Sequence, residues 1–358
     1  MPTYFKKLHA ATQTRFWINN PTLGETQLAL EAGAISCTTN PTYSQRMLRS
    51  GTDGTAALAI VDQAVREERD DATAAEAVQR SLVRQLIERF APLYERNPLR
   101  EGFVSIQGDP IASSDPQRII AAGLEDRKLG PNCIIKIPVT RAGLVAIEEL
   151  LARDIPVIAT EIMAISQALA ACELHARVTR RTGKDTPFGV THITGIFDEF
   201  LAERARAKGV RVREASLLQA GSIVARKQHR LLTERGYRVI MLGGGVRALR
   251  HFTEMVGAGV HVTINWAGTA DTLMEQDPPL VDRIHLQDPR HVVEELATGL
   301  PEFRKAWEEN GLGLEEFEEF GPAAYFRGMF INGWKGLRAV IQQRRRALAA
   351  DERGKGVA

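Results

Sequence analysis

The sequence predicts an α/β protein, a (β/α)8 (TIM) barrel with additional helices. Short apolar segments that end in Gly, Asn, Thr or Asp alternate with longer stretches of helical periodicity, which is typical of a parallel sheet. Eight of these segments are candidate strands, and eight parallel strands close such a barrel. The candidates are residues 16–19, 35–40, 103–109, 133–139, 157–162, 188–195, 239–243 and 260–266.

The segments between the candidate strands have the spacing of amphipathic helices. In TRAGLVAIEELLARD, for example, leucine and isoleucine recur every three or four residues. A long insertion, residues 50–100, predicts two helices that cover a flank of the barrel, and residues 268–358 are mainly helical. Because no internal repeat or low-complexity linker interrupts the chain, we expect a single domain over residues 1–358.

Composition favours a small-molecule enzyme over a nucleic-acid or membrane protein. The 358 residues include 46 basic and 44 acidic side chains, so the net charge of +2 is too small to attract nucleic acid or an anionic membrane. Three widely spaced cysteines (Cys37, Cys133 and Cys172) predict neither a disulfide framework nor a metal site. Without an apolar leader or a membrane-length apolar stretch, and with thiols that suit a reducing compartment, we expect a cytoplasmic protein. We also expect it to use no metal and no cofactor.

A lysine lies inside an apolar strand and marks the first candidate site. Strand alternation in CIIKIPV places Ile134, Lys136 and Pro138 on one face, and only the barrel mouth has room for a lysine. One interpretation is a structural lysine paired with a buried carboxylate. The other is an amine whose pKa is lowered by desolvation, so that it attacks a carbonyl group and forms a Schiff base.

Polar side chains end several other predicted strands, where barrel enzymes carry their chemistry. They are Thr38, Thr39 and Asn40 after the second strand, Ser105, Gln107 and Asp109 after the third, and Thr160 and Glu161 after the fifth. After the seventh strand, a glycine run that includes Gly244 precedes Arg247 at a helix start. This run suits a phosphate group, although a tight turn without any ligand explains it as well.

Together these stretches resemble the transaldolase family of class I Schiff-base aldolases. The motifs are TTNPT, VSIQGDP, IKIPVTRAGLVAIEEL, IPVIATEIMAISQALAACE and LGGGVRALRHFTEMVGAGVHVTIN, and the resemblance covers nearly the whole chain. It implies a Schiff base between Lys136 and a ketose or ketose phosphate, with cleavage or transfer of a dihydroxyacetone unit. It also implies that Asn40 holds the adduct, that Thr160 positions a water, and that Arg247 binds phosphate.

The sequence also departs from the family, in its carboxylates first. Asn19 stands where the family has an aspartate at the end of strand one, and Gln107 replaces the proton-transferring glutamate of strand three. An amide positions a water but exchanges no proton near neutral pH. Ile158 replaces an asparagine of strand five, and Thr191 stands in for a serine of strand six.

Recognition of phosphate is reduced as well. The second phosphate-binding arginine is missing after strand six, so Arg247 is left alone, with Thr38, Thr191 and Gly244 as the other candidate substrate-binding residues. We therefore expect weaker phosphate binding, or a substrate that has no phosphate at that position.

Three residues are candidates for the missing acid or base: His192, Glu161 and Asp109. Alternation turns His192 outward if Thr191 faces inward, and it turns Glu161 outward beside Thr160 unless strand five ends in a turn. Asp109 is in register with Gln107 but also suits an N-cap. The sequence does not choose among the three.

The leading hypothesis is a divergent transaldolase-like enzyme with an altered substrate. We expect its activity as an ordinary transaldolase of the pentose phosphate pathway to be low. Its partner would be a sugar or sugar phosphate, and the resemblance suggests a homodimer. The alternative is a catalytically impaired barrel that acts as a binding or regulatory protein. The lost carboxylates favour that alternative, whereas Lys136 argues against it because a buried lysine is costly without a task.

Overall fold

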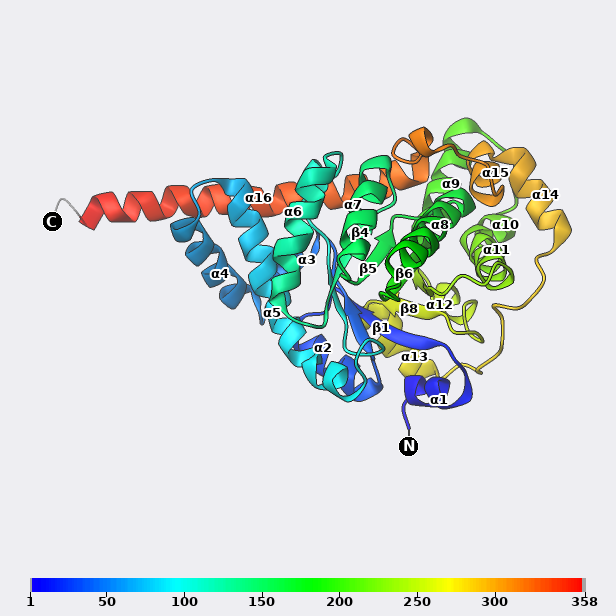
Figure 1. Cartoon of the computed structure of the whole chain (residues 1–358), viewed down its shortest axis with the longest axis horizontal. Helices are drawn as coiled ribbons and strands as arrows, with labels where there is room; N and C mark the ends of the chain where they lie inside the picture. The colour runs from blue at the N-terminus through cyan, green and yellow to red at the C-terminus, as the bar shows by residue number, and fades with distance from the viewer. Residues whose placement is uncertain (1, 356–358) are drawn as a thin grey trace.

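Parallel strands form a closed barrel in the computed structural model, which describes residues 2–355 (Figure 1). Each strand pairs with its neighbours in sequence, and β8 pairs with β1 to complete the ring. The strands are β1 (Arg15–Asn19), β2 (Ser36–Thr38), β3 (Val104–Ile106), β4 (Cys133–Pro138), β5 (Val157–Thr160), β6 (Phe188–Ile193), β7 (Ile240–Gly244) and β8 (His261–Ile264). The predicted (β/α)8 barrel with additional helices is therefore confirmed.

Every predicted segment contains a strand, but several strands end earlier than expected. β2 ends at Thr38 rather than at residue 40, β3 at Ile106 rather than at 109, and β5 at Thr160 rather than at 162. Beyond these points the chain leaves the sheet for a loop. Asn40, Gln107 and Glu161 consequently lie on loops just above the strands, where alternation no longer fixes the direction of a side chain.

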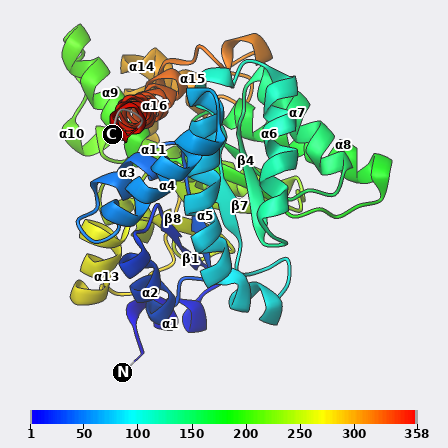
Figure 2. The same cartoon turned by 90° about the vertical axis from the view of Figure 1, so that its left-hand side faces the viewer.

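Helices surround the barrel and fill the insertion between β2 and β3 (Figures 1 and 2). The longer helices are α1 (Tyr4–Ala11), α2 (Leu23–Ala32), α3 (Tyr43–Arg49), α4 (Gly54–Glu67), α5 (Asp71–Arg96), α6 (Pro116–Asp126), α7 (Arg141–Ala152), α8 (Ile165–Thr182), α9 (Gly195–Lys208), α11 (Ala220–Glu234), α14 (Arg290–Gly299), α15 (Pro301–Trp307) and α16 (Gly321–Lys355). The short ones are η1 (Pro110–Ala112), η2 (Arg127–Leu129), α10 (Glu214–Leu217), α12 (Arg250–Thr253), η3 (Trp266–Ala270), α13 (Asp271–Gln276) and η4 (Leu314–Glu316).

The interior of the barrel is layered. An apolar cluster fills its lower part and consists of Trp17, Ile35, Phe103, Ile134, Ile158 and Leu242. Lys136 is two residues further along β4 than Ile134, so its side chain lies above this cluster, toward the carboxyl ends of the strands. Lys136 therefore has apolar side chains below it and polar side chains above it, at the mouth of the barrel.

Helix α16 crosses the mouth and continues beyond the barrel, as its red ribbon shows in Figure 1. It packs against α3, α4, α5, α9 and η1, and its side chains Phe326, Met329 and Phe330 line the cavity at the mouth. Close approach depends on Gly333, where a Cβ atom would lie 2.8 Å from Cγ2 of Thr42 and 3.1 Å from its Cα atom. Helix α16 therefore covers the mouth of the barrel in close contact with Thr42, and we call it a fitted cover for this reason.

Two features are absent from the described residues, 2–355. None of their helices is long and apolar enough to cross a membrane. Nor do their His, Cys, Asp and Glu side chains form a group of three or more that could hold a metal ion.

Candidate active site

Lys136 is fixed by the tight junction between β4 and α7. Thr140 caps α7 by accepting a hydrogen bond of 3.0 Å from the backbone N–H of Gly143. A Cβ atom at Gly143 would lie 1.9 Å from the carbonyl oxygen of Pro138, so only glycine lets the helix start so close to the strand. The backbone that carries Lys136 is thereby held rigidly beneath the mouth.

Burial lowers the pKa of Lys136 to about 8, although the nearby Glu161 carboxylate partly opposes this shift. The lysine is 8% exposed, with Ile158 in register beside it on β5. At a pKa near 8, about a tenth of the amine is neutral at pH 7, compared with well under a thousandth for a solvated lysine. The site thus supplies a nucleophilic amine at neutral pH.

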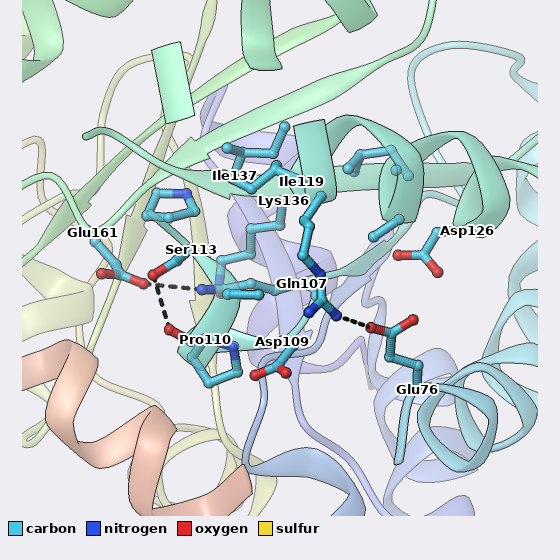
Figure 3. Close-up of a pocket in the computed structure, with 17 residues that line it drawn as sticks. Glu76, Gln107, Asp109, Pro110, Ser113, Ile119, Asp126, Lys136, Ile137 and Glu161 are labelled. Atoms are coloured by element: carbon cyan, nitrogen blue, oxygen red, sulfur yellow. Dashed lines mark hydrogen bonds and ion pairs between the residues drawn. The ribbon is translucent and has the colours of Figure 1, made fainter. Parts of the chain in front are cut away.

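Two cavities meet at Lys136. The larger, of about 300 Å³, opens at the mouth and is lined by Asn19, Thr38, Asn40, Lys136, Thr160, Thr191, Gly244 and Arg247 among others. The smaller, of about 40 Å³, lies beside β3 and β4 and is lined by Gln107, Asp109, Lys136 and Glu161 among others (Figure 3). Most of the candidates from the sequence therefore divide into two groups that share the lysine.

A polar network spans the three consecutive strands β8, β1 and β2. Asn19 donates from Nδ2 to Oδ1 of Asn265 at 2.9 Å and accepts from Oγ1 of Thr38 at 3.0 Å. The hydroxyls of Thr38 and Thr263 lie 2.6 Å apart. Since amides and hydroxyls both donate and accept, this wall of the larger cavity suits a ligand with several hydroxyl groups.

Two buried hydroxyls aim into the mouth without a partner. The Oγ1 atoms of Thr160 and Thr191 are fully buried and hydrogen-bond to no other group among the described residues, and Oε1 of Gln107 is in the same condition. Unpaired buried polar atoms are uncommon and cost free energy, so they call for a ligand or an ordered water. All three lie in the cavities next to Lys136.

Asn40 is held at the mouth by the start of α3. Its Oδ1 atom accepts hydrogen bonds from the backbone N–H of Thr42 at 3.0 Å and from Oγ1 of Thr42 at 2.7 Å. Its own backbone N–H donates to Oδ1 of Asn20 at 3.1 Å. These bonds fix the side chain at the rim, on the opposite side from β6 and β7.

The groups that could bind phosphate already have partners. The guanidinium of Arg247 donates to Oε1 of Glu199 at 2.9 Å. The backbone N–H groups of Arg247 and Ala248 both donate to Nδ1 of His251 at 3.1 Å, and Nε2 of His251 lies 2.9 Å from Oδ2 of Asp198. An anion at this corner would have to share the guanidinium with Glu199 and would find these two N–H groups occupied.

Glu161 turns inward, which simple alternation does not predict. It follows the end of β5 with a φ of 59°, in the left-handed region, and its side chain is 3% exposed. Nε2 of Gln107 donates to Oε1 of Glu161 at 2.9 Å (Figure 3). Burial raises the pKa of Glu161 to about 7, while the cation of Arg327 on α16 is the strongest opposing influence.

The other two acid–base candidates have structural positions. Asp109 caps η1 by accepting a hydrogen bond of 2.8 Å from the backbone N–H of Ile111. His192 points away from the mouth toward α11, where its ring nitrogens lie 3.2 Å from Oε1 of Gln228 and 3.0 Å from the carbonyl oxygen of Gly221. Burial lowers the pKa of His192 to about 4, so it stays neutral and reaches neither cavity at Lys136.

Several residues at the site were not singled out from the sequence. Thr263 and Asn265 alternate through VTIN and enter the mouth from β8, a signal that the period of two could have revealed. Phe330 and Arg327 come from α16 and reach the site only through long-range packing. No local pattern in the sequence predicts that α16 contacts the site.

Comparison with known proteins identifies a family that this chain resembles. The family model described as Transaldolase/Fructose-6-phosphate aldolase matches residues 16–312. A transaldolase of Mycobacterium ulcerans is 36% identical over 135 residues, and Transaldolase 1 of Streptomyces avermitilis is 36% identical over 149. These stretches cover 37% and 39% of this chain and 35% and 37% of the relatives, so the chain matches little more than a third of their length.

Among solved structures, one of 2,3-dimethylmalate lyase aligns with 85% of this chain and 98% of its own at 13% identity. Its TM-score of 0.30 is too low to carry an argument. The family model, in contrast, spans the barrel from β1 past β8 and includes the lysine strand. The chain therefore belongs to the Transaldolase/Fructose-6-phosphate aldolase family, as a divergent member.

Proposed function

We propose that this protein forms a Schiff base between Lys136 and a ketose, and that it cleaves or transfers a dihydroxyacetone-type unit. The observation that carries the proposal is the buried amine of Lys136, whose pKa of about 8 leaves a neutral fraction at neutral pH. It borders a cavity of about 300 Å³ lined by amides and hydroxyls. A neutral amine attacks the ketose carbonyl, and the resulting iminium accepts electrons when a carbon–carbon bond breaks.

The residues around Lys136 have complementary roles in this proposal. Asn40, on the loop after β2, and the Asn19–Thr38 pair at the ends of β1 and β2 bind the hydroxyl groups of the adduct, because they line the same cavity as the amine. Thr160 and Gln107 hold a water with their unpaired oxygen atoms. Such positioning by groups that carry no charge lowers the entropy cost of reaching the transition state.

The proposed substrate lacks a phosphate at the end near Arg247. That guanidinium is already paired with Glu199, and the neighbouring N–H groups donate to His251. The other arginine of the mouth, Arg46, is 2.7 Å from a carboxylate oxygen of Glu25. A phosphate would therefore compete with an existing carboxylate for either cation, whereas a neutral polyol would not.

The test is to trap the adduct with borohydride. Wild type and Lys136→Ala are each incubated with a panel of ketoses and ketose phosphates, reduced, and weighed intact by mass spectrometry. We expect a wild-type adduct that is absent from Lys136→Ala, with neutral ketoses trapped at least as well as their phosphates. Lys227→Ala is the matched control, because burial also lowers the pKa of Lys227 but its amine lies over Trp307 on the outer helices.

The outcome decides between an enzyme and a binding protein. An adduct that persists in Lys136→Ala would place the chemistry on another amine and refute the proposed role. A lack of adduct with every ketose tested would refute the Schiff base and leave the alternative of a binding or regulatory barrel.

A further inference from the structure

The backbone of Glu161 has a conformation that strand alternation does not predict and that steric repulsion disfavours. Thr160 ends β5 with its side chain in the barrel, so an extended Glu161 would point toward the helices. Instead φ is 59°, which residues with a Cβ atom rarely adopt. Strained backbone of this kind persists only where the surroundings enforce it, and it gathers at functional sites.

The surrounding loop enforces the inward turn from two sides. Gln167 accepts at Oε1 from the backbone N–H groups of Met163 at 3.1 Å and Ala164 at 3.2 Å. Its Nε2 atom donates to the carbonyl oxygen of Val139 at 3.2 Å, which ties the loop after β5 to the end of β4. Gln107 then holds the carboxylate itself. The carboxylate is thus kept beside the strand that carries Lys136.

Several charged groups face Glu161. Lys136 lies on β4, Arg327 projects from α16, and Glu318 precedes that helix and pairs with Arg327 at 3.3 Å. The remaining charged side chains of the smaller cavity are Glu76, Asp109, Arg118 and Asp126. Asp126 is bound by Arg80 at 2.7 Å and Asp109 caps η1, so both are committed elsewhere. Glu161 is the carboxylate in this cavity that faces both the amine and a cation of the covering helix.

We propose that Glu161 is the proton-transferring residue of this barrel, acting from the smaller cavity on the adduct held by Lys136. The inference rests on the proposed Schiff base and adds the acid–base group that Asn19 and Gln107 cannot supply. It also gives Gln107 a task, because its Nε2 atom orients the carboxylate while its Oε1 atom remains unpaired beside the cavity. The cavity of about 40 Å³ has room for a water that relays the proton.

The protons balance over one cycle. The neutral amine adds to the ketose carbonyl, and the carbinolamine oxygen leaves as water with a proton from protonated Glu161, which leaves an iminium and a carboxylate. The carboxylate takes the proton of the hydroxyl two carbons from the iminium carbon. The bond between the carbon that bears this hydroxyl and the carbon next to the iminium breaks, its electron pair forms an enamine, and an aldehyde departs. In the transfer direction, the enamine carbon attacks the acceptor aldehyde, whose oxygen receives that proton from Glu161. Water then adds to the new iminium while the carboxylate of Glu161 takes one of its protons, and collapse of the carbinolamine releases the product ketose and the neutral amine.

The test separates proton transfer from formation of the Schiff base. Adduct formation is followed by borohydride trapping, and aldehyde release is followed in a single turnover across a series of pH values and divided by the amount of trapped adduct, in wild type and Glu161→Gln. This division removes the pH dependence that Lys136 gives to adduct formation. The amide keeps an acceptor for Gln107 but transfers no proton near neutral pH. We expect Glu161→Gln to form the Lys136 adduct in full but more slowly, and to release aldehyde from that adduct about 100-fold more slowly, without the acidic limb of the wild-type pH profile.

Two further variants make the result specific. Arg327→Met removes the cation near Glu161, so the acidic limb is expected at higher pH with the adduct intact. Asp109→Asn removes a carboxylate from the same cavity but keeps an acceptor for the cap of η1, and its pH profile is expected to match wild type.

Failure of the proposed Schiff base and failure of the proposed role of Glu161 give different results. If wild type forms no adduct, the proposed function fails. If wild type and Glu161→Gln both form the adduct and release aldehyde at equal rates, the Schiff base stands and the role of Glu161 is overturned. If the acidic limb is retained in Glu161→Gln but disappears in Asp109→Asn, the proton carrier is Asp109.

Discussion

The amine of Lys136 lies 5.8 Å from the centroid of the Phe330 ring, so the helix that follows the barrel covers the lysine of its fourth strand. An aromatic face at this distance attracts the ammonium form only weakly, whereas exclusion of water disfavours that form more strongly. Since burial is the larger influence on the pKa of Lys136, α16 acts mainly as a dry cover for the amine.

Formation of the adduct should depend on pH through Lys136. We expect the rate of trapping to rise with pH and to level off above about 8, because only the neutral amine attacks a carbonyl. Time courses of intact mass at a series of pH values measure this limb. A limb near 10.5, the value for a solvated lysine, would contradict the burial of the amine.

Opening the cover should make the lysine more basic. Phe330→Ala lets water reach the amine, so we expect the trapping limb to move from about 8 toward 10.5 and the rate at neutral pH to fall. Phe330→Leu keeps an apolar cover and serves as the matched control, with a limb close to that of wild type. Equal limbs in wild type and Phe330→Ala would mean that the strands alone exclude water.

The buried carboxylate should make stability depend on pH. The pKa of Glu161 is about 7 in the folded protein and near 4.5 when solvated, so the folded state binds a proton more tightly. Its contribution to stability is therefore fully present below pH 4.5 and is lost as the pH rises through 7, by roughly 3 kcal/mol.

Chemical denaturation of wild type and Glu161→Gln at a series of pH values measures this contribution. The free energy of unfolding of wild type should fall relative to the variant between these two pKa values. A constant difference across that range would show that Glu161 is solvated.

Releasing Arg247 should improve the binding of phosphorylated ketoses. Glu199→Gln removes the carboxylate that engages the guanidinium, so the cation becomes available to a phosphate. We expect the KM for a ketose phosphate to fall by about tenfold, which corresponds to a typical charge-assisted hydrogen bond, and the KM for the neutral ketose to stay the same. Steady-state kinetics with the matched pair of substrates tests this, and equal effects on both would contradict it.

The fit of α16 over the mouth should depend on Gly333. An added Cβ atom there meets both the side chain and the backbone of Thr42, so Gly333→Ala should destabilise the protein by about 1–3 kcal/mol and slow adduct formation. Gly328→Ala in the same helix meets no atom within 4 Å and should stabilise it by roughly 1 kcal/mol. Thermal unfolding and trapping rates distinguish the two variants, and similar behaviour would contradict a fitted cover.

Strand alternation accounts for most of the site that could be predicted from the sequence. Asn19, Thr38, Lys136, Thr160 and Thr191 all lie on strands, where a period of two fixes the side of each residue, and all five line the larger cavity. The same rule turned His192 outward, where the structure places it.

The positions of residues beyond the ends of the strands could not be predicted from the sequence. Glu161 lies one residue past β5, and its left-handed turn depends on bonds that Gln167 makes to residues of two loops. The sequence of α16 predicted a helix but not its place over the mouth, because that depends on the fit of Gly333 against Thr42. Both features come from contacts between segments that are distant along the chain.

The cover supplied by α16 has a consequence for the newly made protein. α16 is synthesised after every strand of the barrel, so the amine of Lys136 remains exposed to water until this helix docks. A solvated lysine is almost entirely protonated at neutral pH and reacts slowly with the free sugars of a cell. On the proposed Schiff-base function, the reactive neutral amine therefore arises only once α16 has docked, and a nascent or truncated chain is spared from glycation at this residue.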